Sequence, residues 1–228
     1  GRKVLFKKAL EMAEKKTKKK ASVEPVEVRV VKCAMSLAAV QGWQDTTMAD
    51  IADEAGLNFG ELRQLYASKT AILAGLIRMT DDLVLRGSDA DMAAEPVRDR
   101  LFDVIMRRLD ALAPYRDGLA EVARDLPSDP GAMACLAAGP MRRSLQWMLE
   151  AARIQPWGLL APLQLKVLGL IYLSVLRVWL HDEGEDLAHT MATLDKALGR
   201  VDNILGSLRR GPRRLFRAED ESTEESTE

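Results

Sequence analysis

Apolar residues recur at helical spacing along most of the chain. Residues 96–113 show the pattern clearly, because Phe102, Ile105, Met106, Leu109 and Leu112 follow the order i, i+3, i+4, i+7 and form one side of a helix. The same period, interrupted by Pro, Gly and polar clusters, predicts helices over residues 25–40, 47–55, 59–66, 68–85, 96–113, 115–125, 130–154, 160–182 and 185–207. No alternating apolar and polar run of useful length predicts a strand. We therefore expect an all-α protein.

Two short helices joined by a tight turn are predicted within residues 46–69, TTMADIADEAGLNFGELRQLYASK. Thr47, with Asp50 three residues later, is typical of a capped helix start. Gly56 lies where that helix must end and turn, because Gly accepts a left-handed conformation. Asn58 can cap the second helix, and the small Ala52 lets the two helices approach closely. This is the pattern of a helix-turn-helix, whose second helix enters the major groove of DNA.

The residues that carry this motif resemble the N-terminal domain of TetR-family repressors. The resemblance is dense from about residue 28 to 77 and rests on Gly42, Thr46-Thr47, Asp50-Ile51-Ala52, Ala55-Gly56, Gly60, Leu62, Tyr66-x-Ser68-Lys69 and Leu73. It implies a TetR-like all-α fold, with a three-helix head and a C-terminal bundle that binds an effector and forms a homodimer. It further implies a cytoplasmic repressor that binds double-stranded DNA at a palindromic operator and responds to a small apolar or lipid-like molecule.

We expect the second helix of the motif to contact DNA. Arg63 can reach a guanine edge or a phosphate, and Gln64 an adenine. Thr47 and Lys69 match family positions that commonly hold the phosphate backbone. The expected DNA-binding residues are Thr47, Asn58, Phe59, Gly60, Glu61, Arg63, Gln64 and Lys69.

Charge is segregated along the 228 residues, although the formal net charge is only −1. Residues 1–20 contain nine basic and two acidic residues, 209–217 contain five Arg, and 219–228 contain six acids. We expect a basic flexible arm (1–24), a DNA-binding head with its linking helix (25–86), an effector-binding and dimerisation domain (96–208) and a disordered tail (209–228). The arm is either a solvated tail or a DNA-contacting segment. Met12-Ala13 is typical of a natural start, so residues 1–11 are either a non-native addition or a basic amphipathic helix.

The predicted body contains two sets of candidate residues. An adaptable apolar pocket, which the family resemblance implies, is expected from Met106, Leu109, Met141, Leu145, Met148, Tyr172, Leu176 and Trp179. Ordinary core packing is the alternative interpretation for each of these residues. A dimer interface in a four-helix bundle is expected from Leu187, Met191, Leu194 and Leu198. Pro140 is expected to kink the helix of residues 130–154.

The sequence contains few residues suited to catalysis. With two His in the chain we identify no general-base arrangement and expect no enzyme, no cofactor and no metal site. His181, Asp182, Glu185 and His189 lie close in sequence, but acids at a helix start explain part of this cluster. Cys33 and Cys135 lie in apolar helical contexts and are expected to be buried free thiols in a reducing compartment. Lys166 and Arg177 interrupt the most apolar stretch, so we expect a buried helix and no stable membrane insertion.

A second resemblance keeps another function open. Residues 179–195, WLHDEGEDLAHTMATLD, and more weakly 100–114, RLFDVIMRRLDALAP, are similar to the ubiquinone-biosynthesis accessory proteins. Those proteins have a TetR-like fold and bind lipid. The TetR family usually places Lys, Thr, Tyr and His where this chain has Phe59, Glu61, Arg63 and Leu65. The alternative function is therefore a lipid-binding accessory protein that does not bind DNA specifically.

Overall fold

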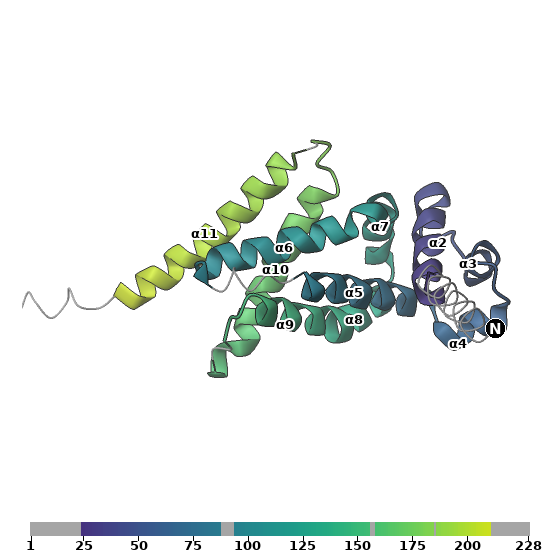
Figure 1. The fold of residues 1–228 in the computed structure, drawn as a ribbon, viewed down its shortest axis with the longest axis horizontal. Helices are drawn as coiled ribbons and strands as arrows, with labels where there is room; N and C mark the ends of the chain where they lie inside the picture. The colour runs from purple at the N-terminus through teal and green to yellow at the C-terminus, as the bar shows by residue number, and fades with distance from the viewer. Residues whose placement is uncertain (1–23, 88–93, 156–157, 185, 211–228) are drawn as a thin grey trace, which may run out of the picture. The chain divides into compact units, whose positions relative to one another are not determined.

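The computed structural model describes residues 24–87, 94–155, 158–184 and 186–210. The described residues form helices and turns and contain no β-strand, which confirms the all-α prediction (Figure 1). The predicted basic arm up to residue 23 and the tail from residue 211 lie outside them. The described residues divide into two compact units. The first comprises residues 24–79 together with Asp117–Met133, and the second comprises the described residues of Thr80–Arg116 and of 134–210.

The first unit is built from short helices around α2. It contains α2 (Val26–Gln41), α3 (Met48–Glu54), α4 (Phe59–Leu65), the first part of α5 (Lys69–Arg86), nearly all of α7 (Arg116–Asp125) and the start of α8 (Pro130–Leu136). A core of fully buried apolar side chains holds these helices together, among them Val30, Val31, Ala34, Ala38, Ile51, Leu62 and Ile72.

Helix α7 crosses α2 with backbone against backbone. A Cβ atom added at Gly118 of α7 would lie 2.3 Å from the carbonyl oxygen of Met35 in α2. Real Cβ atoms do not approach a backbone oxygen that closely, so only glycine allows this crossing. Val122, one turn later in α7, is also buried. The α7 helix is therefore an integral part of the unit that contains the helix-turn-helix.

The second unit contains the longer helices. These are the rest of α5, α6 (Val97–Leu112), α9 (Arg142–Ala151), α10 (Ala161–Trp179) and α11 (Ala188–Arg210), and α10 packs against α11 (Figure 1). Single turns of 3₁₀ helix occur in this unit at Ala113–Tyr115 and Gly158–Leu160, and in the first unit at Leu126–Ser128. A π-helical turn, Ala137–Met141, contains Pro140 and separates α8 from α9, so the helix predicted over residues 130–154 changes its helix type at this proline.

A buried ion pair lies at the centre of the second unit. The guanidinium of Arg108, which is 1% exposed, donates to the carboxylate of Asp81 from α5 and to the hydroxyl of Tyr172 from α10 at 3.0 Å. Ser144 of α9 donates to the same carboxylate at 2.6 Å. Burial opposes the charge of Arg108, but Tyr172 and Asp81 outweigh it and raise the pKa of the guanidinium. Four helices thus share one polar network.

The helices begin and end close to the predicted positions, but the compact units do not follow the predicted domains. The expected boundary at residues 87–96 lies partly outside the described residues. The units instead divide α5 after Met79 and assign Asp117–Met133 to the first unit.

Candidate nucleic-acid interface

Helix α3 begins with a complete capping box. The Thr47 hydroxyl accepts the N–H of Asp50 at 3.1 Å, and the Asp50 carboxylate accepts the N–H of Thr47 at 2.9 Å. The hydrogen bonds from Thr47 hold the pKa of the Asp50 carboxyl below its usual range. The N-terminus of α3 is therefore closed by its own side chains.

A tight turn connects α3 to α4. Gly56 has φ +63°, and Leu57 returns its N–H to the carbonyl of Ala52 at 2.9 Å. Ile51 and Leu62 are completely buried between the helices. These contacts produce the helix-turn-helix that the sequence predicts.

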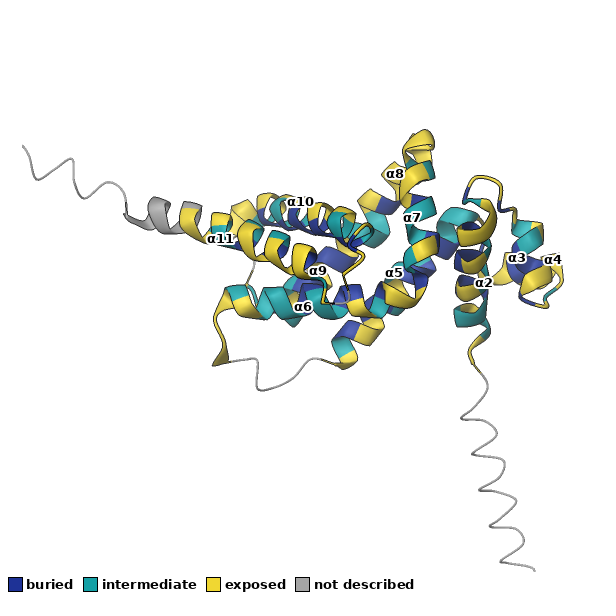
Figure 2. Ribbon diagram, turned by 90° about the horizontal axis from the view of Figure 1, so that it is seen from above, coloured by how far each residue is buried: buried dark blue, intermediate teal, exposed yellow. Residues whose placement is uncertain are grey.

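Helix α4 has one buried anchor, Leu62, and otherwise an exposed surface (Figure 2). Its capping box pairs Asn58 with Glu61: the N–H of Glu61 donates to the Asn58 side chain, and the N–H of Asn58 donates to the Glu61 carboxylate, both at 2.9 Å. Glu61 thus stabilises the start of the helix. The Asn-x-x-Glu spacing is a capping signature, so the sequence contained this signal. The predicted contact residues that are solvent-exposed are Thr47, Asn58, Phe59, Gly60, Glu61, Arg63 and Gln64.

Lys69 differs from the other predicted contact residues because it is half-buried. Its ammonium donates to the carbonyl of Trp43 and, at 3.3 Å, to that of Gln44, and lies 4.7 Å from the centre of the Trp43 ring. Burial lowers the pKa of Lys69, against the attraction of Asp125 and Asp45. Lys69 therefore fastens the turn between α2 and α3.

Acidic residues outnumber basic ones in the described part of the first unit. Residues 24–79 and 117–133 contain eleven Asp and Glu but six Lys and Arg. Several of these acids are bonded to backbone amides, as Asp50 and Glu61 are within the motif and Asp129 is at the start of α8. The described residues of this unit therefore lack the basic excess that attracts DNA regardless of its sequence.

Solved structures with the same arrangement of helices are transcriptional regulators. A TetR transcriptional regulator from Nitrosomonas europaea superposes with a TM-score of 0.62 and 26% identity, covering 78% of this chain and 98% of that one. A TetR transcriptional regulator from Rhodococcus sp. RHA1 superposes with a TM-score of 0.56 and 22% identity, covering 76% of this chain and 93% of that one. A TetR-family regulator from Shewanella sp. PV-4 superposes with a TM-score of 0.53 and 18% identity, covering 77% of this chain and 96% of that one.

The chain has the fold of the TetR-family transcriptional regulators. No family model matches its sequence, and no curated protein matches it either. The similarity therefore lies in the fold more than in the sequence.

The residues predicted to line a pocket in this TetR fold are largely packed. Leu109, Leu145, Met148, Tyr172 and Trp179 are buried, and Met106, Met141 and Leu176 are half-buried. Tyr172 among them accepts a hydrogen bond from the buried Arg108, a residue for which the sequence pattern predicted no role. Burial alone fits both interpretations, core and pocket, so the pocket stays a prediction.

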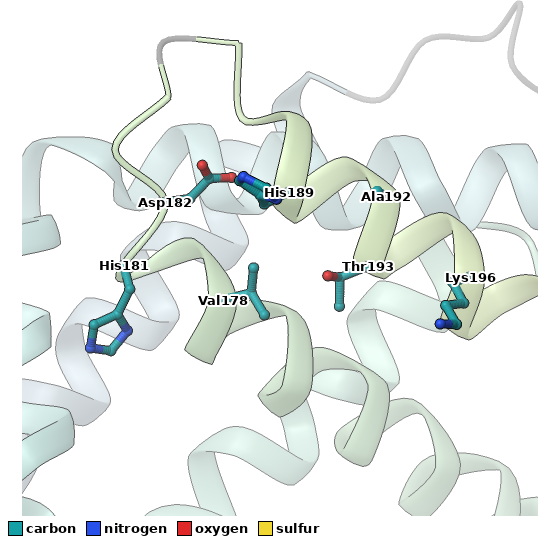
Figure 3. A pocket seen from close by; sticks show the side chains of 7 residues that line it. All are labelled: Val178, His181, Asp182, His189, Ala192, Thr193 and Lys196. Carbon is teal, nitrogen blue, oxygen red and sulfur yellow. The ribbon is translucent and has the colours of Figure 1, made fainter.

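A groove of about 590 Å³ lies elsewhere in the second unit, between the end of α10 and the start of α11 (Figure 3). Its lining is formed by Val178, His181, Asp182, His189, Ala192, Thr193 and Lys196. Asp182 is buried, and its carboxylate accepts the N–H and the hydroxyl of Thr190 at 2.9 and 2.7 Å. These bonds hold the pKa of Asp182 below its usual range. Asp182 therefore caps the start of α11. Glu185, the fourth member of the cluster noted in the sequence, lies outside the described residues.

The residues predicted for the dimer interface differ in exposure. Leu194 and Leu198 are buried within the single chain, Leu187 is half-buried, and Met191 is 42% exposed. More large apolar side chains are exposed on α10, namely Leu163, Leu170 and Leu173, than on the described part of α11, where Met191 is one. Figure 2 shows exposed and buried residues alternating along α10. The segment Gly158–Trp179 is long and apolar enough to span a membrane, and only 28% of its most apolar window is buried. The prediction of a buried helix is therefore wrong for most of α10, whose buried residues include Gln164 and Tyr172.

Proposed function

We propose that the chain is a DNA-binding transcriptional regulator that acts as a homodimer. The observation that carries this proposal is α4, a short helix capped by Asn58 and Glu61, anchored by Leu62 and otherwise exposed. A helix held in this way can enter a major groove without losing a core contact. Two copies related by a two-fold axis would read half-sites about 34–36 Å apart, or a multiple of that distance.

Base contacts and phosphate contacts have different sources in this proposal. Arg63 and Gln64 on the exposed side of α4 are suited to base edges. The basic residues of 1–20 would supply phosphate contacts, because the described first unit has an excess of acids. Lys69 would contribute mainly by holding the turn that begins α3.

Selection of bound fragments from genomic DNA, at two salt concentrations, tests the proposal. Wild-type protein should enrich a specific fragment, and Arg63→Ala should lower its affinity by about tenfold or more, as for loss of a bidentate base contact. Arg143→Ala, an exposed arginine of α9, is the matched control and should bind as the wild type does. Equal binding by Arg63→Ala and Arg143→Ala would contradict the assignment of α4 as the reading helix.

The proposed homodimer would use α10 together with α11. Leu163, Leu170 and Leu173 of α10 are 53, 70 and 56% exposed, and their spacing of seven and three residues places them on one side of the helix. Covering them with a second copy would remove apolar surface from water. Leu170→Glu should yield monomers in analytical ultracentrifugation. Ser174→Glu adds the same charge at an exposed position of α10 without removing an apolar side chain, and should remain a dimer.

We further propose that the protein is a repressor and that an effector bound in the second unit releases it from DNA. An apolar effector would have to open the packing around Met106, Met141 and Met148, whose flexible side chains make such rearrangement less costly. It would release DNA only if it and DNA favour different conformations.

A lipid-binding accessory role is the second candidate. The excess of acids in the first unit and the exposed leucines of α10 favour it. Mass spectrometry of organic extracts from the purified protein would reveal a bound isoprenoid or quinone. If such a lipid is found and DNA binding does not depend on sequence, the accessory role is the better explanation and the regulator proposal fails.

A further inference from the structure

The turn of residues 42–47 joins α2 to α3 and fixes where the helix-turn-helix begins. Gly42 has φ +89°, its carbonyl accepts the Thr46 hydroxyl at 2.7 Å, and Thr46 is 1% exposed. Thr47 then caps α3. A displacement of this turn would move α3, and α4 with it, because Ile51 and Leu62 hold the two helices together.

Polar side chains of two other helices hold the backbone of this turn. Asp125, the last residue of α7, accepts the N–H of Gln44 at 2.9 Å. Lys69, the first residue of α5, donates to the carbonyls of Trp43 and Gln44. The N–H side of the turn is thus bonded to a carboxylate and the carbonyl side to an ammonium. The bond from Gln44 holds the pKa of the Asp125 carboxyl below its usual range.

The position of Asp125 is itself fixed by the close crossing of α7 and α2. Gly118 and Asp125 are seven residues apart, so they lie on the same side of α7 two turns from each other. Gly118 lies against the backbone of Met35, and Val122 between them is buried. The α7 helix can therefore neither rotate nor withdraw without breaking either the crossing or the Asp125 bond.

We infer that Asp125 is a positioning residue for DNA recognition, which holds the 42–47 turn and thereby sets the placement of α3 and α4. The inference for DNA rests on the proposed function. The chain enters α7 from the second unit at Arg116 and returns to it after Met133, so the residue that holds the turn belongs to a segment connected to the second unit at both ends.

Three variants separate positioning from charge. Asp125→Ala removes a negative charge from a DNA-binding unit, so an effect of charge alone would strengthen binding to DNA. Loss of positioning predicts the opposite sign, a specific affinity about tenfold weaker, as for loss of one charge-assisted hydrogen bond. Asp125→Asn keeps an acceptor oxygen for Gln44 and should restore most of the affinity. Asp129→Ala, which removes the acceptor for the N–H of Ala132 in α8, is the control for charge: it takes one negative charge from the same unit and should bind DNA at least as tightly as the wild type.

Hydrogen exchange of backbone amides provides a readout that does not depend on DNA. Asp125→Ala should increase exchange at Gln44 and through α3 and α4, whereas Asp129→Ala should increase it only at the start of α8. Specific binding by wild type and Asp125→Ala with equal affinity would overturn the inference. If wild type binds no sequence specifically, the proposed function fails, and unchanged exchange in Asp125→Ala would separately refute the positioning role.

Discussion

Lys69 in the first unit and Arg108 in the second are both cations beside an aromatic ring, but their surroundings differ. Lys69 is half-buried, lies 4.7 Å from the ring centre of Trp43, and donates to backbone carbonyls of a surface turn. Arg108 is 1% exposed, lies 5.3 Å from the ring centre of Tyr172, and bonds to the buried side chains of Asp81 and Tyr172. Water can replace the partners of Lys69, whereas the partners of Arg108 are largely buried: the Asp81 side chain is 11% exposed and Tyr172 is 1% exposed.

The same chemistry therefore serves two purposes. Removing Arg108 leaves the buried carboxylate of Asp81 without its counter-ion, so the second unit is stable only when both members of the ion pair are present. Around Lys69 and Asp125, each bond contributes a modest amount and can be lost with local consequences. The second unit has a centre that resists change, and the motif of the first unit is held by contacts that are individually weak.

The largest expected effect comes from Arg108→Met. It leaves Asp81 charged and buried and should lower the free energy of unfolding by about 3–5 kcal/mol. Unfolding in urea, followed by circular dichroism, measures this loss. Arg107→Met removes a partly exposed pair with Asp103 on the same helix and a hydrogen bond to the carbonyl of Gly87, and should cost about 1 kcal/mol. Similar costs for both variants would remove the contrast between a fully buried cation and a partly exposed one.

Gly118→Ala should have an intermediate effect. The added methyl group meets the Met35 carbonyl at 2.3 Å, so α7 must shift and stability should fall by about 1–3 kcal/mol. Thermal unfolding provides the measurement. Gly139→Ala is the matched control, because no atom lies within 4 Å of its added Cβ. A neutral Gly118→Ala would mean that α7 is not held against α2 in solution.

Lys69→Met should have the smallest effect, about 1 kcal/mol of stability, because water can solvate the carbonyls of Trp43 and Gln44. Its consequence should be local: faster amide exchange over residues 43–47 and a shift in Trp43 fluorescence. Lys32→Met on α2 is a control for removing one exposed positive charge from the same unit. A loss as large as that of Arg108→Met would show that the turn is as essential as the buried network.

Local signals in the sequence were sufficient for the helices and for the motif. Thr47 with Asp50, Gly56, and Asn58 carry their information within a few residues, because caps and turns depend on short-range bonds. The role of Glu61 could be predicted in the same way from its spacing to Asn58.

Long-range packing was not accessible from sequence. Nothing near Asp125 indicates that it reaches Gln44, which is 81 residues away. The stripe of Leu194 and Leu198 predicted an apolar side of α11, but periodicity does not distinguish a core within one chain from an interface between two. Lys69 matched a family position, yet its bonds to Trp43 and Gln44 depend on the folded turn.

The interleaving of the two units has a practical consequence for dissecting the protein. A fragment ending near Met79 would contain every helix of the DNA-binding motif but would lack Asp117–Met133. It would leave the Met35 backbone without α7, and Gln44 without its carboxylate acceptor. Such a fragment could fail to bind DNA for reasons unrelated to α4. Tests of the motif therefore require the intact chain, or a fusion that supplies α7 through a linker.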